Sequence, residues 1–164
     1  MTNLTAFLDL IAFSEGTSTS KWTKNNGYDV LVSGVNDTAS DHIFNSYSDH
    51  PFQRRPAKVV RYNPLLRSTA AGRYQIILPT WGDLAAKLML HNFEPFCQDC
   101  VAIELIKEHG ALDAVQGGLI EQAIFLCSKV WASFPGNDYG QSGGHTMEVL
   151  EAKFKTINPP LSQI

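Results

Sequence analysis

The first apolar residues of the chain repeat at helical intervals. They follow one another at steps of three and four and so share one face of a helix: Leu4, Phe7, Leu8, Ile11 and Ala12. Gly16 is expected to end this helix, and Asn3 or Thr5 is available to cap its first turn. The helix must therefore turn this face toward a core.

The pattern changes after this helix. Three segments are rich in β-branched and aromatic residues and are separated by Gly, Asp, Ser and Pro: residues 28–32, 44–48 and 58–62. Helical patterns return at residues 80–90, 95–109, 119–133 and 146–157, the first opened by a capping box at residues 80–83. We therefore expect one α+β domain over residues 1–164, in which a small antiparallel sheet lobe at about residues 26–64 interrupts a mostly helical body.

Length and composition agree with a single soluble domain. The chain has 164 residues, of which 44% are hydrophobic, enough for one packed core. No apolar run reaches the roughly 18 residues that a membrane span needs, and no basic residue precedes the first apolar stretch as in a secretory signal. We expect a monomer that is made in the cytoplasm and stays there unless something else releases it.

The cysteines give little support for a metal or redox site. Cys97 and Cys100 have the spacing of such a motif, but neither a second cysteine pair nor a close histidine pair accompanies them. Cys127 is the third member of an odd set. We expect all three to be small apolar residues on buried helix faces, and we expect no metal or other cofactor.

Glu15 is an acid where the first helical stripe calls for an apolar residue. It continues the apolar face in the last turn before Gly16. Partial burial and the negative end of the helix dipole both raise the pKa of a carboxyl group there, and a protonated Glu in an apolar pocket is typical of a glycosidase general acid. The alternative is a frayed helix end whose side chain swings into water.

The segment Ser68-Thr-Ala-Ala-Gly-Arg-Tyr-Gln75 joins hydroxyl groups to small residues, an aromatic ring and an amide. Small residues let a bulky ligand approach the backbone, and Tyr74 and Gln75 can stack on and hydrogen-bond a polar ring. An ordinary helix start explains the same residues equally well. The tryptophans could also stack on sugars, but core positions are more usual for them: Trp22, Trp81 and Trp131.

Several blocks, taken in order, resemble one family. The chain is similar to the lambda-type phage endolysins, lytic transglycosylases of the lysozyme superfamily, through "AFLDLIAFSEGT", "NGYDVLV", "YSDHP", "STAAGRYQ", "IKEHGAL", "VWASFPG" and "YGQ". The resemblance implies a lysozyme-like fold with a cleft between a helical lobe and a three-stranded lobe. It also implies cleavage of peptidoglycan between N-acetylmuramic acid and N-acetylglucosamine, and release from the host cytoplasm to the periplasm through a separately encoded holin.

The resemblance also suggests site residues. Glu15 matches the catalytic acid of the family, and Ser68, Tyr74 and Gln75 match its groove motif loosely. Tyr139 stands where related enzymes place a cleft tyrosine. The "YSDHP" block adds a short run of candidate substrate-binding residues: Tyr47, Ser48 and Asp49.

Hydrolysis would require a second carboxylate to act as nucleophile or to activate water. Where phage lysozymes of the T4 type carry their second acid and a following threonine, this chain has Lys24 and Val30. Three other acids remain available, of which Asp49 is the most plausible: Asp29, Asp41 and Asp49. Without a second acid, groups of the substrate must take over its role. The 2-acetamido carbonyl can stabilise the cationic C1, and the C6 hydroxyl can then attack C1 to give a 1,6-anhydro sugar without water. We expect this transglycosylase reaction, with hydrolysis as the alternative.

Charge suggests an anionic partner. Six basic residues and no acid lie between His50 and Gly82, although the formal net charge of the chain is −3: Arg54, Arg55, Lys58, Arg61, Arg67 and Arg73. Peptidoglycan carries carboxylates and would serve, while a solvated loop face and a non-catalytic wall- or nucleic-acid-binding protein are the alternatives. No nucleic-acid-binding module is recognisable, so we expect no nucleic-acid partner. Residues 34–55 also contain what look like extra loop residues compared with the family pattern, and these could change which parts of the substrate the protein accepts.

Overall fold

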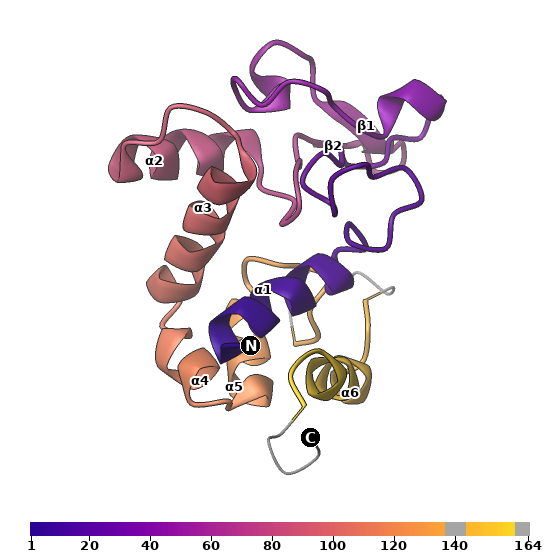
Figure 1. Ribbon diagram of the computed structural model, residues 1–164. Helices are drawn as coiled ribbons and strands as arrows, with labels where there is room; N and C mark the ends of the chain where they lie inside the picture. The colour runs from indigo at the N-terminus through magenta and orange to yellow at the C-terminus, as the bar shows by residue number, and fades with distance from the viewer. Residues whose placement is uncertain (137–143, 160–164) are drawn as a thin grey trace. The chain divides into compact units, whose positions relative to one another are not determined.

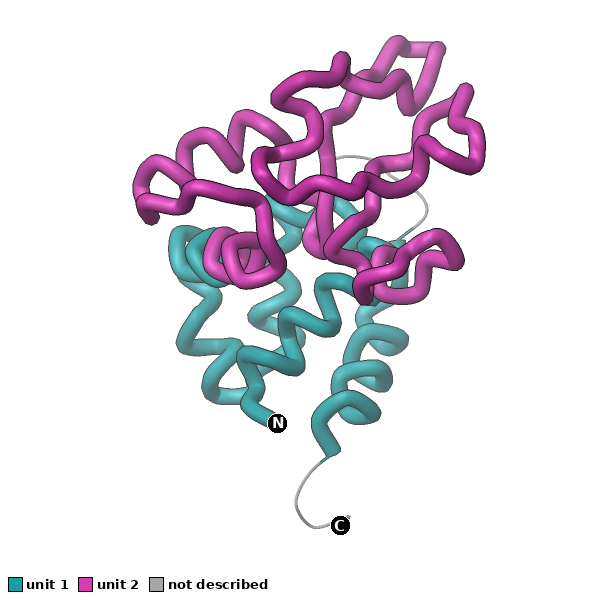
Figure 2. The backbone as a smooth tube through the Cα atoms, turned by 45° about the horizontal axis from the view of Figure 1, so that its top comes forward, with its two compact units in different colours: residues 1–15, 103–164 teal, residues 16–102 magenta. Residues whose placement is uncertain are grey.

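The computed structural model describes residues 1–136 and 144–159 of the chain. The chain divides into two compact units, one made of Met1–Glu15 and Ile103–Ile164 and the other of Gly16–Ala102 (Figure 2). The first unit joins the N-terminal helix to the helices at the end of the chain, and the second contains all of the β-structure found in the described residues.

The first unit is helical (Figure 1). Its helices are α1 (Asn3–Ser14), the end of α3 (Pro95–Glu108), α4 (Leu112–Gln116), α5 (Ile120–Cys127) and α6 (Met147–Ile157). Helix α1 contacts α4 and α6, and α5 contacts α4 and α6. The stripe predicted from the sequence is the buried face of α1, where Phe7 and Ile11 are fully enclosed. Burial of such side chains contributes about 1.5–3 kcal/mol each.

The two ends of α1 differ in how well they could be predicted. Gly16 follows the helix with φ +70°, a conformation that glycine adopts without strain, so the helix ends before Gly16 as expected. Glu15 is its C-cap. The expected N-cap, Asn3 or Thr5, is wrong. Thr2 holds that position, because its hydroxyl oxygen accepts a hydrogen bond from the backbone N–H of Thr5 at 3.2 Å.

The second unit contains a two-stranded sheet, two short 3₁₀ turns and helix. Strands β1 (Lys58–Arg61) and β2 (Leu66–Ser68) pair antiparallel. The 3₁₀ turns η1 (Ala39–Asp41) and η2 (Pro51–Gln53) lie in the segment that precedes β1, and α2 (Leu78–Leu88) and the start of α3 follow the sheet.

The expected three-stranded sheet is wrong for the described residues. Residues 58–61 do form a strand, but residues 28–32 contribute only the single bridges of Val30 with Ile43 and Leu31 with Ala71. Residues 44–48 contain neither a strand nor a bridge. The partner of β1 is instead Leu66–Ser68, which the pattern missed because these residues lack the β-branched and aromatic side chains that mark a strand. The register set by the turn between the two strands decides the pairing.

Helix boundaries shifted where local hydrogen bonds compete with the pattern. The expected capping box at residues 80–83 lies inside α2, whose first N–H, on Leu78, donates to the Thr69 hydroxyl at 3.0 Å. The helix expected over residues 119–133 ends at Cys127, where the Ser128 hydroxyl donates to the carbonyl of Phe125 at 2.7 Å. Helices α3 and α6 follow the prediction closely, and α4 was not predicted.

The expected core positions are confirmed for two of the three tryptophans and two of the three cysteines, whereas Cys100 is only half-buried. Trp81, Trp131, Cys97 and Cys127 are buried, and burial raises the pKa of the Cys127 thiol to about 12. Trp22 is half-exposed and stacks on His42 with ring centroids 4.6 Å apart. Among the described residues, no helix is both long and apolar enough to cross a membrane.

Candidate active site

Glu15 lies at the end of α1, in the first unit. Its backbone N–H donates to the carbonyl of Ile11 at 2.9 Å, so the helical hydrogen-bond pattern extends to this residue. Its side chain continues the buried face and is held: the Ser133 hydroxyl donates to Oε1 at 2.6 Å. The carboxyl group is therefore held in place by a defined partner, unlike the group at a frayed helix end.

The surroundings of Glu15 favour its protonated form. Burial raises the pKa of the Glu15 carboxyl above its ordinary value, while hydrogen bonds from the hydroxyl and backbone of Ser133 act in the opposite direction and only partly offset it. An acid whose pKa is raised in this way holds its proton closer to neutral pH, which is the property that a general acid needs.

Ser133 was missed as a site residue, although it stands in the quoted block "VWASFPG". It lies in the turn that follows α5, between two buried aromatic residues, Trp131 and Phe134. The Phe134 ring packs on Phe7 of α1 with centroids 6.0 Å apart, which places this turn beside the helix that carries Glu15. Because 118 positions separate Ser133 from Glu15, no local spacing could have revealed the pair.

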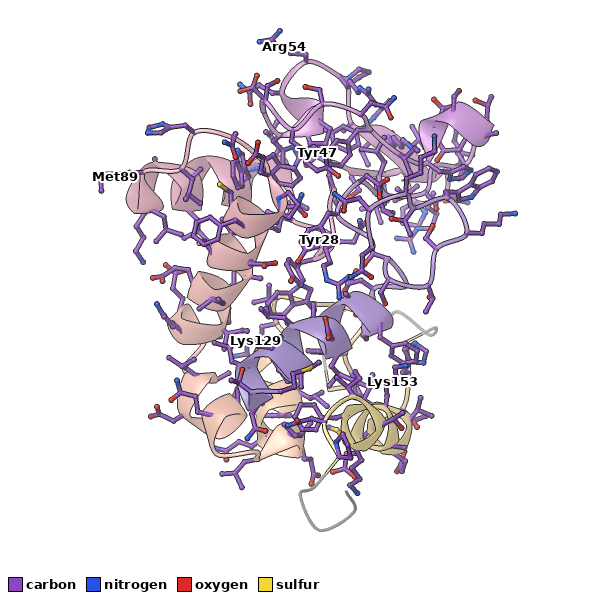
Figure 3. The ribbon with its side chains drawn as sticks, in the orientation of Figure 1. Tyr28, Tyr47, Arg54, Met89, Lys129 and Lys153 are labelled. Atoms are coloured by element: carbon purple, nitrogen blue, oxygen red, sulfur yellow. The ribbon has the colours of Figure 1, made fainter. Side chains whose placement is uncertain are left out.

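Residues 47–49 lie in the second unit, in the loop that leads to η2. Ser48 and Asp49 line a cavity of about 210 Å³, together with Ser46 and Arg54 among others. Tyr47 packs edge-on against Phe44 and its hydroxyl accepts a hydrogen bond from the Asn25 amide at 2.8 Å. Figure 3 labels Tyr47, and it shows the side chain of Arg54, the residue that follows η2, pointing outward.

His50, the next residue of the same block, is structural. It is buried in an aromatic cluster with Phe93, 4.7 Å away between ring centroids. Its Nε2 donates to the Ile76 carbonyl at 2.9 Å and its Nδ1 accepts from the backbone N–H of Phe52 at 3.3 Å, which fits the neutral ring. Burial lowers the pKa of His50 below its ordinary value.

The segment from Ser68 to Gln75 is a bridged turn of the second unit and not the start of a helix. Ser68 ends β2, and its hydroxyl accepts from the N–H of Ala70 at 3.1 Å. Gln75 has φ +49°, and its side-chain amide donates to the Gly72 carbonyl at 3.1 Å. Ser68 and Gln75 are both half-buried, and both of these hydrogen bonds are local.

The prediction that Tyr74 binds substrate must be corrected. Only 1% of the residue is exposed, and its hydroxyl donates to the carboxylate of Asp99 at 2.6 Å. Its ring meets Tyr28 edge-on, with centroids 6.2 Å apart. A ring that is enclosed in this way cannot stack on a sugar, so the Tyr74 side chain belongs to the core of the second unit. An aromatic residue next to small residues gave no sign of which way its ring would turn.

The position of Tyr74 leads to a testable expectation. Tyr74→Phe should lower the free energy of unfolding by about 1–2 kcal/mol, because a hydrogen bond to a charged carboxylate is lost while the ring is kept. The specific activity of the folded variant should stay near that of the parent protein. Urea denaturation and a wall-cleavage assay measure the two quantities. A loss of activity in a variant of unchanged stability would return Tyr74 to the list of substrate-binding residues.

The side chain of Asp29 holds the loop at residues 23–29 together by hydrogen bonds. Its carboxylate accepts from the Thr23 hydroxyl at 2.5 Å and from the backbone N–H of Lys24 at 2.8 Å, and only 4% of the residue is exposed. Lys24, which stands where phage lysozymes of the T4 type carry their second acid, thus contributes its backbone N–H to this loop. An acid satisfied and buried in this way is a structural group.

The other two acids also have local partners. Asp41 accepts from the N–H and hydroxyl of Thr38 at the start of η1, and these bonds lower the pKa of Asp41. Asp49 forms an ion pair with Arg54 at 3.3 Å, with 47% of the Asp49 side chain exposed. Asp49 is therefore the acid of this set whose side chain is most open to solvent.

Two cations of the basic segment bind partners inside the second unit. The Lys58 ammonium donates to the carboxylate of Asp37 at 2.7 Å and also bonds the carbonyl of Asp41. Arg73 is 3% exposed and its guanidinium bonds the carbonyl of Asn26. The sequence count of six cations therefore overstates the positive charge that this segment offers to a partner.

Two further expectations concern Tyr139 and metal binding. Tyr139 lies outside the described residues. The described residues contain no group of three or more His, Cys, Asp or Glu side chains that could hold a metal ion. Glu15 belongs to one unit and the remaining described candidates belong to the other, where Ser48 and Asp49 line the same cavity.

Fold and site together define a lysozyme-like protein. The chain is similar to a solved structure of bacteriophage lambda lysozyme complexed with a chitohexasaccharide, with a TM-score of 0.80, 45% sequence identity, and coverage of 94% of this chain and 93% of that one. A second structure of lysozyme from bacteriophage lambda gives a TM-score of 0.80 at 41% identity, covering 95% of this chain and 94% of that one.

The family follows from the sequence comparisons. The chain belongs to the endolysin family, whose model, described as Endolysin, matches residues 5–158. It is 47% identical to the endolysin of Escherichia phage P2 over 94% of this chain and 92% of that protein. It is also 45% identical to the endolysin of Escherichia phage lambda, over 97% of this chain and 93% of that protein.

Proposed function

We propose that this protein is an endolysin that degrades host peptidoglycan by lytic transglycosylation, with Glu15 as its general acid and base. One observation carries the proposal: a carboxyl group at the end of α1 is buried enough to have a raised pKa and is fixed through one oxygen by Ser133. Membership in the endolysin family and the similarity to a lysozyme complexed with a chitohexasaccharide support a glycan as the substrate.

The reaction needs a single acid. Glu15 donates its proton to the bridging oxygen between N-acetylmuramic acid and N-acetylglucosamine, and the bond from C1 to that oxygen breaks. C1 passes through an oxocarbenium-like or oxazolinium state. The C6 hydroxyl then attacks C1, and the Glu15 carboxylate takes the hydroxyl proton as the 1,6-anhydro ring closes. Glu15 ends protonated, no water is consumed, and the nucleophile belongs to the substrate itself.

The surroundings of Asp29 and Asp41 support transglycosylation over hydrolysis. Asp29 is buried and each of its carboxylate oxygens accepts a hydrogen bond, and Asp41 accepts hydrogen bonds from Thr38. Hydrolysis remains the second candidate because Asp49 has a half-exposed side chain beside a cavity. The solved relatives are also named lysozymes.

We place substrate binding at the residues of the second unit whose polar groups reach its surface. Ser48 and Asp49 line the cavity of about 210 Å³, and the Tyr47 ring is half-exposed. Ser68 and Gln75 complete the set proposed for the second unit, from which the buried Tyr74 is now omitted. Tyr139, outside the described residues, stays a proposal from the family resemblance alone. Release to the wall through a separate holin pore, action as a monomer, and the absence of a nucleic-acid partner are part of the same proposal.

Product analysis tests the reaction. Purified peptidoglycan digested with this protein should release muropeptides that end in 1,6-anhydro-N-acetylmuramic acid, each lighter by one water than the hydrolytic product. Mass spectrometry before and after borohydride reduction distinguishes the two, because only reducing ends are reduced. Products with reducing ends would overturn transglycosylation and favour hydrolysis. A failure to clear permeabilised cells in a turbidity assay would instead favour a wall-binding protein without activity.

A further inference from the structure

Three side chains of the first unit form a directed chain of hydrogen bonds. The Ser14 hydroxyl donates to the Ser133 hydroxyl at 2.9 Å, and the Ser133 hydroxyl donates to Oε1 of Glu15 at 2.6 Å. Ser14 belongs to the last turn of α1 and is buried. Neither serine has a role in the reaction as written above.

The direction of the chain follows from the chemistry of its members. A hydroxyl group has one proton to donate, and an ionised carboxylate can only accept. Because the oxygen of Ser133 already accepts from Ser14, its own proton is free to point at Glu15. Each bond in such a chain polarises and strengthens the next.

From this arrangement we infer that Ser133 is a positioning residue that reserves Oε1 of Glu15, so that Oε2 is the atom that carries and transfers the catalytic proton, and that Ser14 orients Ser133 for this task. The inference rests on the proposed role of Glu15 as general acid. With Oε1 occupied as an acceptor, protonation at Oε2 leaves the O–H free to face the glycosidic oxygen. In the second half of the reaction, Oε2 is the oxygen that takes the proton from the C6 hydroxyl.

The surroundings of Ser133 hold it firmly enough for this purpose. Phe134 is 1% exposed and packs on Phe7 of α1, and the Trp131 ring meets Phe134 edge-on at 6.2 Å between centroids. Gly144 also lies so close that a methyl group there would be 2.4 Å from the carbonyl oxygen of Ser133. A site on a turn packed in this way holds its donor in one place.

The inference makes a prediction about pH dependence, with a definite sign. The hydrogen bonds from Ser133 lower the pKa of Glu15, against the larger effect of burial. Glu15 must be protonated to donate, so activity falls as pH rises through its pKa. In Ser133→Ala the hydroxyl bond is gone and the pKa rises, so the alkaline limb of the kcat profile should move to higher pH. We also expect kcat to fall by up to about 100-fold, with KM little changed, because the acid is less well placed.

Two further variants separate positioning from packing. Ser133→Thr keeps a hydroxyl and should return the alkaline limb toward that of the parent protein. Ser14→Ala removes only the outer donor and should shift the limb in the same direction by a smaller amount. The pKa of Glu15, followed through its side-chain carboxyl signal by ¹³C NMR on the whole protein, should move in step with the limb.

The outcomes are distinguishable from failure of the proposed function. If Ser133→Ala leaves both the limb and the NMR-measured pKa where they were, the positioning role is wrong, even if kcat falls. A Ser133→Thr variant that behaves like Ser133→Ala also contradicts it. If Glu15→Gln is fully active, the proposed function fails first. An inactive Glu15→Gln together with an unmoved Ser133→Ala overturns the inference alone.

Discussion

Glu15→Gln is expected to lower the rate of peptidoglycan cleavage by about 10²–10⁴-fold, the contribution of a positioned proton donor. The amide has nearly the volume of the carboxyl group and its oxygen can still accept from the Ser133 hydroxyl, so the side chain should keep its place. It cannot release a proton to the glycosidic oxygen or take one from the C6 hydroxyl. Turbidity decay of permeabilised cells and the yield of muropeptides measure the loss.

The stability of this variant supplies a control with a definite sign. Burial raises the pKa of Glu15, so the folded state binds more protons than the unfolded state between the ordinary pKa and the raised one. The free energy of unfolding of the parent protein is therefore reduced as pH rises through that window. Glu15→Gln lacks this penalty and should be at least as stable as the parent protein near neutral pH. A variant that is inactive because it has unfolded would say nothing about catalysis.

A matched variant tests whether the position matters. Glu121 is exposed in the first turn of α5, in the same unit, and Glu121→Gln makes the same chemical change away from the site. Its cleavage rate should equal that of the parent protein. Asp49→Asn then distinguishes the two mechanisms: a loss as deep as that of Glu15→Gln would favour hydrolysis with a second acid. An active Glu15→Gln would contradict the acid role altogether.

The position of Glu15 at the end of a buried helix face could be predicted from the sequence, because it depends on local geometry. A helical stripe and a terminating glycine place a residue on a face without any knowledge of the rest of the fold, and α1 runs as the stripe predicts. The same reasoning located α3 and α6. The sheet was harder, since β2 is recognised through its register with β1 and not through its own composition.

Partners that are distant in sequence were the part that could not be predicted. Ser133 meets Glu15 only after α5 ends early and its following turn packs on α1 through Phe134. Tyr74 was predicted to stack on a ligand, because composition does not tell which way a ring points. In the structure its hydroxyl donates to Asp99, which turns the ring into the core. Spacing describes one element at a time, whereas these contacts join several.

Gln98 is another residue that only the structure reveals, and it joins three segments of the second unit. It is a polar residue with 0% exposure in α3. Its Oε1 accepts from the backbone N–H of Arg73 at 2.9 Å, and its Nε2 donates to the carbonyls of Tyr28 and Phe93 at 3.0 and 2.9 Å. Gly72 permits this approach, because a methyl group there would lie 2.1 Å from Oε1. Three buried backbone groups thus depend on a single amide.

Gln98→Leu should therefore lower the free energy of unfolding by about 3–5 kcal/mol, since each buried group left without a partner costs about 1–3 kcal/mol. Leucine has a similar volume, so the loss measures the hydrogen bonds more than a cavity. Gln122→Leu is the matched control: Gln122 is exposed on α5, and the same substitution there should change stability by no more than about 0.5 kcal/mol. Urea denaturation measures both. Equal stabilities of the two variants would show that the turn at residues 72–73 does not depend on Gln98, and that other contacts hold it against α3.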